Sequence, residues 1–262
     1  MEKILFVGAG NMAEGIIAGL IKDKIYESHD IYIDEALEKR RKLMEDRYQL
    51  SIHEHQFAEY GVIVLAVRPQ DFADVVEKLK GKIAKETIIL SVCAGIDLAQ
   101  MEHDFGAEHK IVRVMPNVLI EVKHGYSAAC INQNIDNHDK VIIQKICDAL
   151  GQTEFIPESL FNEFTAFSCA GPAYVMYFLN AMIDAGVQAG FSREMSRNMV
   201  CENLIGSALT IRDGEKHPYE ITDAMTSPAG VTIEGLHALN EYGFSGIVQT
   251  AVQRAVDKSN RF

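Results

Sequence analysis

The feature of this chain that most constrains its fold is a glycine-rich turn close to the N-terminus. A compact apolar run, residues 3–7, ends at Gly8, and Gly8, Gly10 and Ala13 complete the pattern G-x-G-x-x-A. An apolar run of this length that ends in glycine is typical of a strand buried on both faces. Gly8 permits a tight turn, Gly10 lets the backbone approach a pyrophosphate, and Ala13 allows the next helix to pack closely on the strand. The segment therefore predicts a strand–turn–helix unit that binds a dinucleotide.

The residues after this turn repeat an alternation of strands and helices. Apolar runs of strand length recur at residues 3–7, 30–34, 62–67, 87–92 and 110–115. Stretches with helical periodicity or high charge separate them, at residues 11–24, 36–47, 70–80 and 98–105. Such repeats imply a parallel sheet with helices on both faces. We therefore expect an α/β fold with a Rossmann-type, doubly wound parallel sheet.

The last third of the chain has a different character. Residues 159–261 show no period-2 strand pattern, and glycine and proline separate long helical stretches. We expect an all-helical domain over residues 156–262, after a dinucleotide-binding domain over residues 1–155. Apolar helices at residues 173–185 and 204–211 present more apolar surface than so thin a domain can bury. The helical domain is therefore expected to form a homodimer, and further assembly of dimers stays open.

The cofactor is expected to lie on the glycine-rich turn and at the end of the second strand. Free N–H groups at the start of the first helix face the phosphates, and the expected contacts are Gly8, Ala9, Gly10, Asn11 and Met12. Asp34 closes the second strand, where a carboxylate accepts hydrogen bonds from ribose hydroxyls and repels a 2′-phosphate. This favours NADH, although Asp34 is explained equally well as a solvated strand end or a helix cap. Arg40 and Arg41 follow a little later and can reach a phosphate, so NADPH stays open.

Composition excludes several classes of partner. The formal net charge of −12 and the pI near 5.2 argue against nucleic acid or an anionic membrane as the main partner. The five cysteines are scattered and never spaced as C-x-x-C, which favours reduced thiols over disulfides or a metal site. No apolar run approaches the roughly 18 residues that a membrane-spanning helix needs. We therefore expect a cytoplasmic, soluble protein with no metal.

Nine short segments, spread over nearly the whole chain, match a known family in order and spacing. They are residues 6–14, 65–70, 91–96, 113–117, 171–174, 184–186, 217–218, 226–228 and 243–244. On these segments the chain resembles pyrroline-5-carboxylate reductase, the last enzyme of proline synthesis. The resemblance implies NAD(P)H-dependent reduction of 1-pyrroline-5-carboxylate to L-proline by hydride transfer to a cyclic imine. It also implies an intertwined dimer.

The resemblance further implies contacts for both halves of the site. It places the nicotinamide half of the cofactor and the adenosine against a first group of residues: Ala66, Val67, Arg68, Pro69 and Ala94, with His53 near the adenosine. It places the substrate against a second group: Ser168, Glu215, Gly230, Val231 and Thr232.

The chain departs from the usual family pattern at five positions. On the substrate side, Ala170 replaces a serine and Ala229 replaces a glycine. Elsewhere, His53 replaces an asparagine, Arg68 a lysine and Val118 a threonine. The first two departures bear on the substrate or on catalytic efficiency more than on the fold.

Reduction of a cyclic imine needs a hydride donor, an anchor for the carboxylate and a proton for the ring nitrogen. The cofactor carries the hydride, so the protein mainly positions the substrate and polarises the imine. Backbone N–H groups around Gly230 and Thr232, at a helix N-terminus, suit a carboxylate. The Thr232 hydroxyl is the candidate catalytic group, because it can donate to the nitrogen directly or through water. Two explanations without a catalytic or binding role stay open: Thr232 is only a helix cap, and Glu215 is only a surface acid.

Some other enzyme classes conflict with the sequence, and two alternatives stay open. Cys169 is not expected to be a nucleophile, because no histidine between His138 and His217 offers it a base. A β-hydroxyacid dehydrogenase uses a lysine of its helical domain, and none occurs between Lys145 and Lys216. A reductase of a related imine or keto acid stays open. So does a non-catalytic relative that keeps the nucleotide domain as a sensor or regulatory subunit.

Overall fold

The structure, a computed structural model, describes residues 3–53 and 56–261 and divides the chain into two compact units. The first unit comprises Met1–Cys169 with Ser259–Phe262, and the second comprises Ala170–Lys258. The sequence placed the boundary earlier, at residue 155, where the last strand ends. The segment that follows this strand stays with the sheet, because Phe161 is buried against Met115, Ala128 and Cys130.

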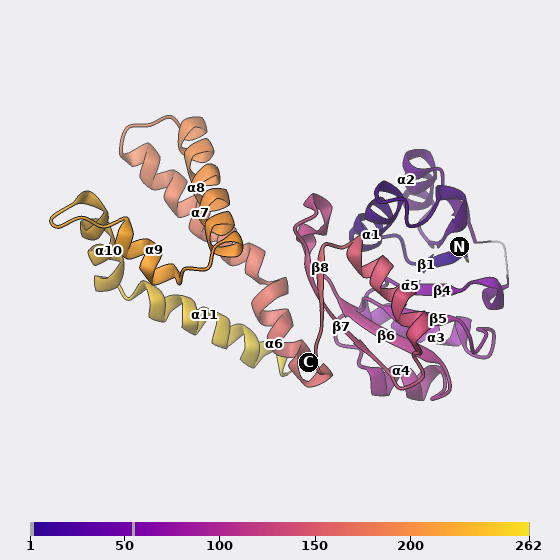
Figure 1. The fold of residues 1–262 in the computed structure, drawn as a ribbon. Helices are drawn as coiled ribbons and strands as arrows, with labels where there is room; N and C mark the ends of the chain where they lie inside the picture. Colours follow the sequence, from indigo (N-terminus) through magenta and orange to yellow (C-terminus); the bar gives the residue numbers. More distant parts are fainter. Residues whose placement is uncertain (1–2, 54–55, 262) are drawn as a thin grey trace. The chain divides into compact units, whose positions relative to one another are not determined.

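The first unit is built on one eight-stranded sheet (Figure 1), in the order β3-β2-β1-β4-β5-β6-β7-β8. The strands are β1 (Ile4–Val7), β2 (Ile31–Asp34), β3 (Ser51–Ile52), β4 (Val62–Leu65), β5 (Ile88–Ser91), β6 (Lys110–Met115), β7 (Tyr126–Ile131) and β8 (Gln152–Phe155). The six strands from β3 to β6 run parallel, which confirms the parallel arrangement predicted for five of them. The chain leaves β1 toward β2 and later returns to place β4 on the other side of β1, which makes the sheet doubly wound.

The sequence did not predict β3, β7 and β8. β7 is antiparallel to β6, and β8 is parallel to β7. The connection over residues 116–125 is shorter than the dozen or more residues that a parallel crossover requires, so β7 has to reverse direction. Its central residues Ser127, Ala128 and Ala129 have weak strand propensity, which hid the strand from pattern analysis. The predicted doubly wound parallel sheet is confirmed, and the structure adds an antiparallel strand, β7, toward this edge.

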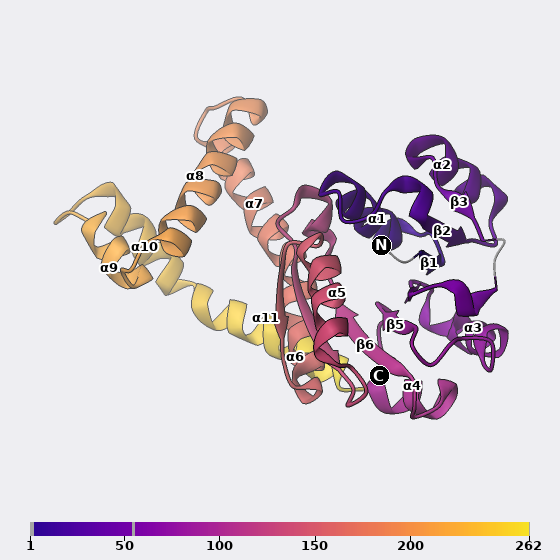
Figure 2. The ribbon, with the colours of Figure 1, turned by 45° about the vertical axis from the view of Figure 1, so that its right-hand side comes forward.

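Helices cover both faces of the sheet, as Figure 1 and Figure 2 show. One face carries α1 (Asn11–Lys22), α2 (Glu38–Tyr48) and α5 (Asn137–Asp148), and the other carries α3 (Phe72–Leu79) and α4 (Leu98–Phe105). Each face of the sheet has its own hydrophobic core, and alternate residues of β1 pack into one or the other. Ile4 and Phe6 point to the first face, Leu5 and Val7 to the second. All four residues are buried, which explains why the strand is continuously apolar.

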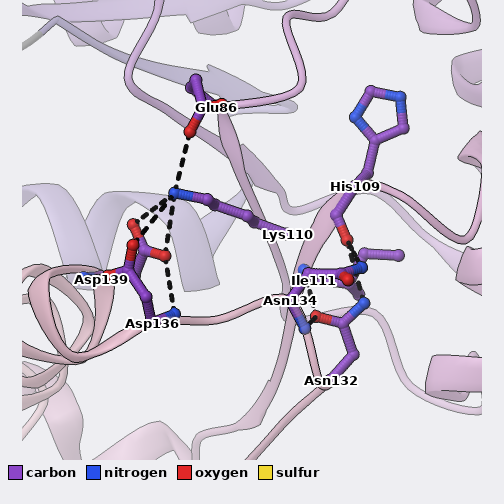
Figure 3. Close-up of polar contacts among 8 residues, drawn as sticks. All are labelled: Glu86, His109, Lys110, Ile111, Asn132, Asn134, Asp136 and Asp139. Atoms are coloured by element: carbon purple, nitrogen blue, oxygen red, sulfur yellow. Dashed lines mark hydrogen bonds and ion pairs between the residues drawn. The ribbon is translucent and has the colours of Figure 1, made fainter.

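A buried ion pair ties α5 to the beginning of β6. Figure 3 shows Lys110 Nζ among three carboxylates, 3.0 Å from Asp139, 3.2 Å from Glu86 and 3.8 Å from Asp136. The Asp139 side chain is only 4% exposed, whereas that of Glu86 is 86% exposed. Asp136 caps α5 by accepting a hydrogen bond from Asp139 N, and the Asp139 carboxylate accepts one from Asp136 N. Lys110 therefore neutralises a capping box that is partly withdrawn from water.

Removing this cation is expected to destabilise the sheet unit. In Lys110→Met the Asp139 carboxylate stays buried without its counter-charge, so the free energy of unfolding should fall by roughly 2–4 kcal/mol. Urea denaturation measures the change. The matched control is Glu86→Gln, which removes an exposed partner of the same lysine and should cost no more than about 0.5 kcal/mol. If Lys110→Met lowers the free energy of unfolding no more than Glu86→Gln does, the buried ion pair does not contribute the expected stability.

The second unit contains only helices, as predicted. They are α7 (Gly171–Gln188), α8 (Arg193–Asp213), α9 (Pro218–Ala224), α10 (Val231–Glu241) and α11, which spans Phe244–Ser259. The short helix α6 (Phe161–Phe164) and a π-helical turn, Thr165–Cys169, precede them in the first unit. Within residues 170–258, three side chains are buried: Ile183, Ser196 and Val200. The unit thus has almost no core of its own.

Apolar side chains cover the surface of this unit instead. Tyr177 is 82% exposed, Met176 53% and Ile205 53%. The described chain also holds one helical stretch, Glu158–Gln188, that is long and apolar enough to cross a membrane by length and composition alone. Its mean hydropathy is 1.3, so the expectation that no run approaches such a length was wrong here. Only 11% of its most apolar window is buried within the single chain, which leaves a large surface for a partner.

Candidate functional site

A cleft opens at the carboxyl ends of the central strands, where the strand order reverses between β1 and β4. Open α/β sheets bind ligands at this switch point. The cleft has a volume of about 650 Å³. Its lining comes from the ends of β1, β2 and β4 and from α3: Val7, Gly8, Gly10, Asp34, Glu35, Ala36, Leu37, Ala66, Val67, Arg68, Asp71, Asp74, Val75 and Lys78.

The glycine-rich turn has the shape that a pyrophosphate requires. Gly8 has a φ of +88°, and a Cβ there would lie 2.7 Å from the carbonyl oxygen of Ala66. A Cβ on Gly10 would meet no atom within 4 Å, so this glycine borders open space. Gly10 is the N-cap of α1 and supplies no side chain to the first N–H groups of the helix. The turn therefore fits the phosphates of a dinucleotide, with free N–H groups at a helix N-terminus.

The other three residues expected to contact the cofactor on this turn, Ala9, Asn11 and Met12, differ in how far they are exposed. Ala9 is buried in the core and is not part of the described cleft lining; its N–H and C=O bind the Glu35 and Arg40 side chains. Asn11 is exposed, and Met12 packs partly against the core.

Two acidic side chains lie at the end of β2. Asp34, the residue singled out from the sequence, lines the cleft and is ion-paired with Lys78 from α3. Glu35, which the sequence analysis passed over, accepts hydrogen bonds from Ala9 N and Leu37 N, each at 2.8 Å. The carboxylate that touches the glycine-rich turn is therefore that of Glu35. Its position one residue beyond the strand was the available signal.

The residues expected at the nicotinamide follow two neighbouring strands. Ala66, Val67 and Arg68 line the cleft after β4, and Pro69 begins the next turn of helix. Ala94 is exposed in the turn after β5, and β4 and β5 pair through to their last residues.

A buried thiol joins the turns that follow these two strands. Cys93 Sγ donates to the carbonyl oxygens of Leu65 at 3.4 Å and Val67 at 3.3 Å. Burial raises the pKa of Cys93, so the thiol keeps its proton and stays a donor.

His53 lies apart from this lining. Its ring stacks on Phe57 with centroids 4.5 Å apart, and its Nδ1 is 2.9 Å from the Tyr60 hydroxyl. The described residues that line the cleft do not include His53. Its expected place near the adenosine stays a prediction.

Ser168 lies beside the carboxyl end of β6. Asn117 Nδ2 donates to the Ser168 carbonyl at 3.4 Å, and Cys169 Sγ donates to the Pro116 carbonyl at 3.5 Å. Burial raises the pKa of Cys169 to about 12, which favours the protonated thiol at neutral pH and argues against a nucleophilic role. Asn117 is a contact that sequence reasoning missed, although it stands in the matched segment 113–117.

The N-terminus of α10 forms a second place for an anion. Gly230 is its N-cap, without a side-chain cap, so the first N–H groups of the helix stay free. Thr232 is the second helical residue and Gly230 is the N-cap. The alternative that Thr232 serves only as a helix cap is therefore wrong. Its hydroxyl has no hydrogen-bond partner among the described residues. By contrast, the hydroxyls of Thr210 and Thr250 donate to carbonyls one helical turn earlier. Thr232 therefore presents a free donor beside free N–H groups.

The turn before α10 keeps its shape despite the departure at Ala229. Gly230 N donates to Ser227 O at 3.0 Å, which closes a turn with Pro228 and Ala229 at its centre. Ala229 has a φ of +55°, a conformation that favours glycine and costs alanine roughly 1–2 kcal/mol.

Glu215 is not brought to this loop by any contact. It is exposed between α8 and α9, and within the described residues no hydrogen bond or ion pair joins it to Gly230 or Thr232. In the described ranges no group of three or more His, Cys, Asp or Glu side chains is arranged to hold a metal ion.

Taken together, a nucleotide cleft at the switch point of a doubly wound sheet and a separate helical unit define a two-domain, NAD(P)-dependent oxidoreductase. Sequence profiles agree: one described as "NADP oxidoreductase coenzyme F420-dependent" matches residues 3–95, and one described as "Pyrroline-5-carboxylate reductase dimerisation" matches residues 158–262. The second unit is thus a dimerisation domain.

Individual relatives extend over nearly the whole chain. Pyrroline-5-carboxylate reductase of Synechocystis sp. is 34% identical over 256 residues, covering 97% of this chain and 95% of the relative. That of Aquifex aeolicus is 34% identical over 260 residues, covering 99% and 97%. A structure of Plasmodium falciparum pyrroline carboxylate reductase with NADP bound gives a TM-score of 0.88 at 30% identity, covering 98% of this chain and 97% of that chain. The chain belongs to the pyrroline-5-carboxylate reductase family, which confirms the resemblance drawn from the motifs.

Proposed function

We propose that this protein reduces 1-pyrroline-5-carboxylate to L-proline with a nicotinamide cofactor. The observation that carries the proposal is family membership over nearly the entire chain, at 34% identity to two relatives of that name. The intact glycine-rich turn and the uncapped start of α10 support it, because they supply a dinucleotide site and a carboxylate site. The substrate is a small molecule, and neither a nucleic acid nor a membrane has a part in the reaction.

The proposed reaction divides its tasks among few residues. When bound, NAD(P)H supplies the hydride that adds to the imine carbon. Gly8 and Gly10 shape the turn that holds the pyrophosphate, and Ala66 to Pro69 with Ala94 flank the nicotinamide. The backbone N–H groups of Val231 and Thr232 hold the substrate carboxylate, and the Thr232 hydroxyl donates a hydrogen bond to the ring nitrogen, directly or through water. An imine that arrives protonated needs no stronger acid.

One pair of measurements tests this function. Oxidation of NADH and of NADPH is followed with pyrroline-5-carboxylate as acceptor, and binding of each nucleotide is titrated in parallel. Turnover that depends on the imine supports the proposal. Tight nucleotide binding without turnover contradicts it and favours a non-catalytic sensor, the reading in which Ala170 and Ala229 reflect loss of the substrate site. Turnover with another imine or keto acid instead would reassign the substrate.

We further propose that the active protein is a homodimer, or a larger assembly of dimers, in the cytoplasm. The exposed apolar helices of residues 170–258 support the dimer, since three buried side chains do not make a core. The five free cysteines fit a reducing compartment.

The location of the interface has a direct test. In sedimentation analysis the full chain is expected to be a dimer or a multiple of one. A chain ending at Cys169 keeps the sheet, α6 and the π-helical turn, and it is expected to be a monomer that still binds nucleotide. If the shortened chain stays dimeric, the interface belongs to the sheet unit instead.

A further inference from the structure

The geometry points to Glu35 as the residue that makes the cleft selective for NADH over NADPH. This inference rests on the proposed function, because it concerns the cofactor that the reductase would use. It differs from the expectation drawn from the sequence, which gave this role to Asp34.

Glu35 is built into the glycine-rich turn. One carboxylate oxygen accepts from Ala9 N at 2.8 Å, between the two glycines that shape the turn. The other accepts from Leu37 N, also at 2.8 Å. Arg40 Nε donates to the carbonyl oxygen of the same residue, so Ala9 is held through both its N–H and its C=O. The Glu35 carboxylate is therefore fixed on the wall of the cleft, next to the position of the phosphates.

A carboxylate held in this way suits a ribose and not a phosphate. An ionised carboxylate offers about four lone-pair sites, and the two N–H groups of Ala9 and Leu37 use only two of them. The sites that remain accept hydrogen bonds from the 2′- and 3′-hydroxyls of the adenosine ribose. A 2′-phosphate would bring about two negative charges to the same place and offers no donor when ionised.

The cations around the cleft are already engaged. Two cations line it, and each faces an aspartate: Lys78 pairs with Asp34, and Arg68 with Asp71 at 2.8 Å. Among the described residues no cation is paired with Glu35 or with Asp74, which also lines the cleft.

Two arginines of α2 are likewise committed, and among the described residues the cleft lining includes neither Lys39 nor Arg41 of the same helix. Arg40 and Arg47 both bind the Glu14 carboxylate. Burial favours a raised pKa for Glu14, but hydrogen bonds from Arg40, Tyr48 and Arg47 outweigh it and hold the pKa below its usual value. Arg40 therefore does not offer its charge to a 2′-phosphate. The cleft carries four carboxylates against two cations, and its excess charge is negative.

The test measures nucleotide affinity in the absence of turnover. Dissociation constants for NADH and NADPH are determined by titration of the full-length protein and of Glu35→Gln. Glutamine keeps one oxygen for Ala9 N and removes the charge. Wild type is expected to bind NADH at least about tenfold more tightly than NADPH, and Glu35→Gln to reduce this ratio at least about tenfold, mainly through tighter NADPH binding.

Two matched controls separate Glu35 from its neighbours. Asp74→Asn removes one charge from the same cleft without touching the glycine-rich turn, and it should change the ratio less than about threefold. The double variant Asp34→Asn with Lys78→Met removes an ion pair without changing the net charge. It should leave the ratio near that of wild type.

Each alternative outcome has a distinct meaning. A wild-type preference for NADPH, an unchanged ratio in Glu35→Gln, or an equal loss of preference in the double variant overturns the inference. If Glu35→Gln shifts the ratio as expected but the protein shows no turnover with pyrroline-5-carboxylate, the selectivity stands and the proposed function fails. If wild type binds neither nucleotide, both fail.

Discussion

Gly10→Ala is expected to leave the protein folded and to weaken nucleotide binding by roughly 10- to 100-fold, equivalent to the loss of about 1.5–3 kcal/mol in hydrogen bonds to a charged group. Gly10 has a φ of −65° and a ψ of −176°, which alanine adopts freely. An added Cβ meets no protein atom within 4 Å, so it projects into the space where the pyrophosphate would lie. Titration with NADH measures the loss, and thermal unfolding of the ligand-free protein is expected to change little.

Gly8→Ala is the matched contrast, because the same methyl group has a different effect two residues earlier. At Gly8 the φ of +88° disfavours alanine, and the new Cβ would overlap the Ala66 carbonyl oxygen at 2.7 Å. The ligand-free protein should therefore lose at least about 2 kcal/mol of stability. If Gly10→Ala destabilises as much as Gly8→Ala, or binds NADH as well as wild type does, Gly10 does not border the phosphate site.

The central part of the fold was predictable because its strands are buried on both faces. Ile4 and Leu5 face opposite cores and both are apolar, so this strand stands out without any alternation. β7 escaped detection because its small residues leave space for neighbours and carry no hydrophobic pattern. Ala128 is buried in a cluster with Phe161, a residue more than thirty positions later in the chain. Pattern analysis within a short window has no access to such a contact.

The candidate site was predictable where backbone shape decides and less so where side-chain pairing decides. Gly8 and Gly10 were identified because a tight turn and a close approach require glycine. Asp34 and Glu35 have nearly the same chemistry, and their surroundings differ because Lys78, in the last turn of α3, pairs with the first of them. Only the three-dimensional arrangement of β2 and α3 distinguishes the two carboxylates.

The helical unit shows another limit of reasoning from sequence. Its helices were predicted by periodicity, yet most of their apolar side chains stay exposed within the chain. Ala229 was recognised as a departure from a glycine, and the structure adds its physical meaning. The chain accepts a φ of +55° at alanine to keep the turn that frees the N–H groups of α10.

Thr232→Ala is expected to lower kcat/KM for pyrroline-5-carboxylate by roughly 10- to 1000-fold, since losing one donor aimed at the reacting group costs about 1.5–4 kcal/mol of transition-state stabilisation. The Thr232 hydroxyl has no partner among the described residues, and its place as the second residue of α10 puts it next to the free N–H groups. Because the N-cap is Gly230, loss of the hydroxyl removes no helix cap, and the change in stability should be small. Steady-state kinetics with saturating NADH measures the effect.

Thr232→Ser is the control for this experiment, because it keeps the hydroxyl and removes only a methyl group. Serine should retain most of the activity if the hydroxyl donates to the ring nitrogen, whereas a packing role for the methyl group predicts that serine and alanine lose activity equally. NADH affinity should stay within about twofold in both variants, because the expected phosphate contacts at Gly8 and Gly10 lie in the other unit. If Thr232→Ala keeps full kcat/KM, the free N–H groups of α10 alone hold the substrate, and the proton for the nitrogen comes from water or from the protonated imine itself.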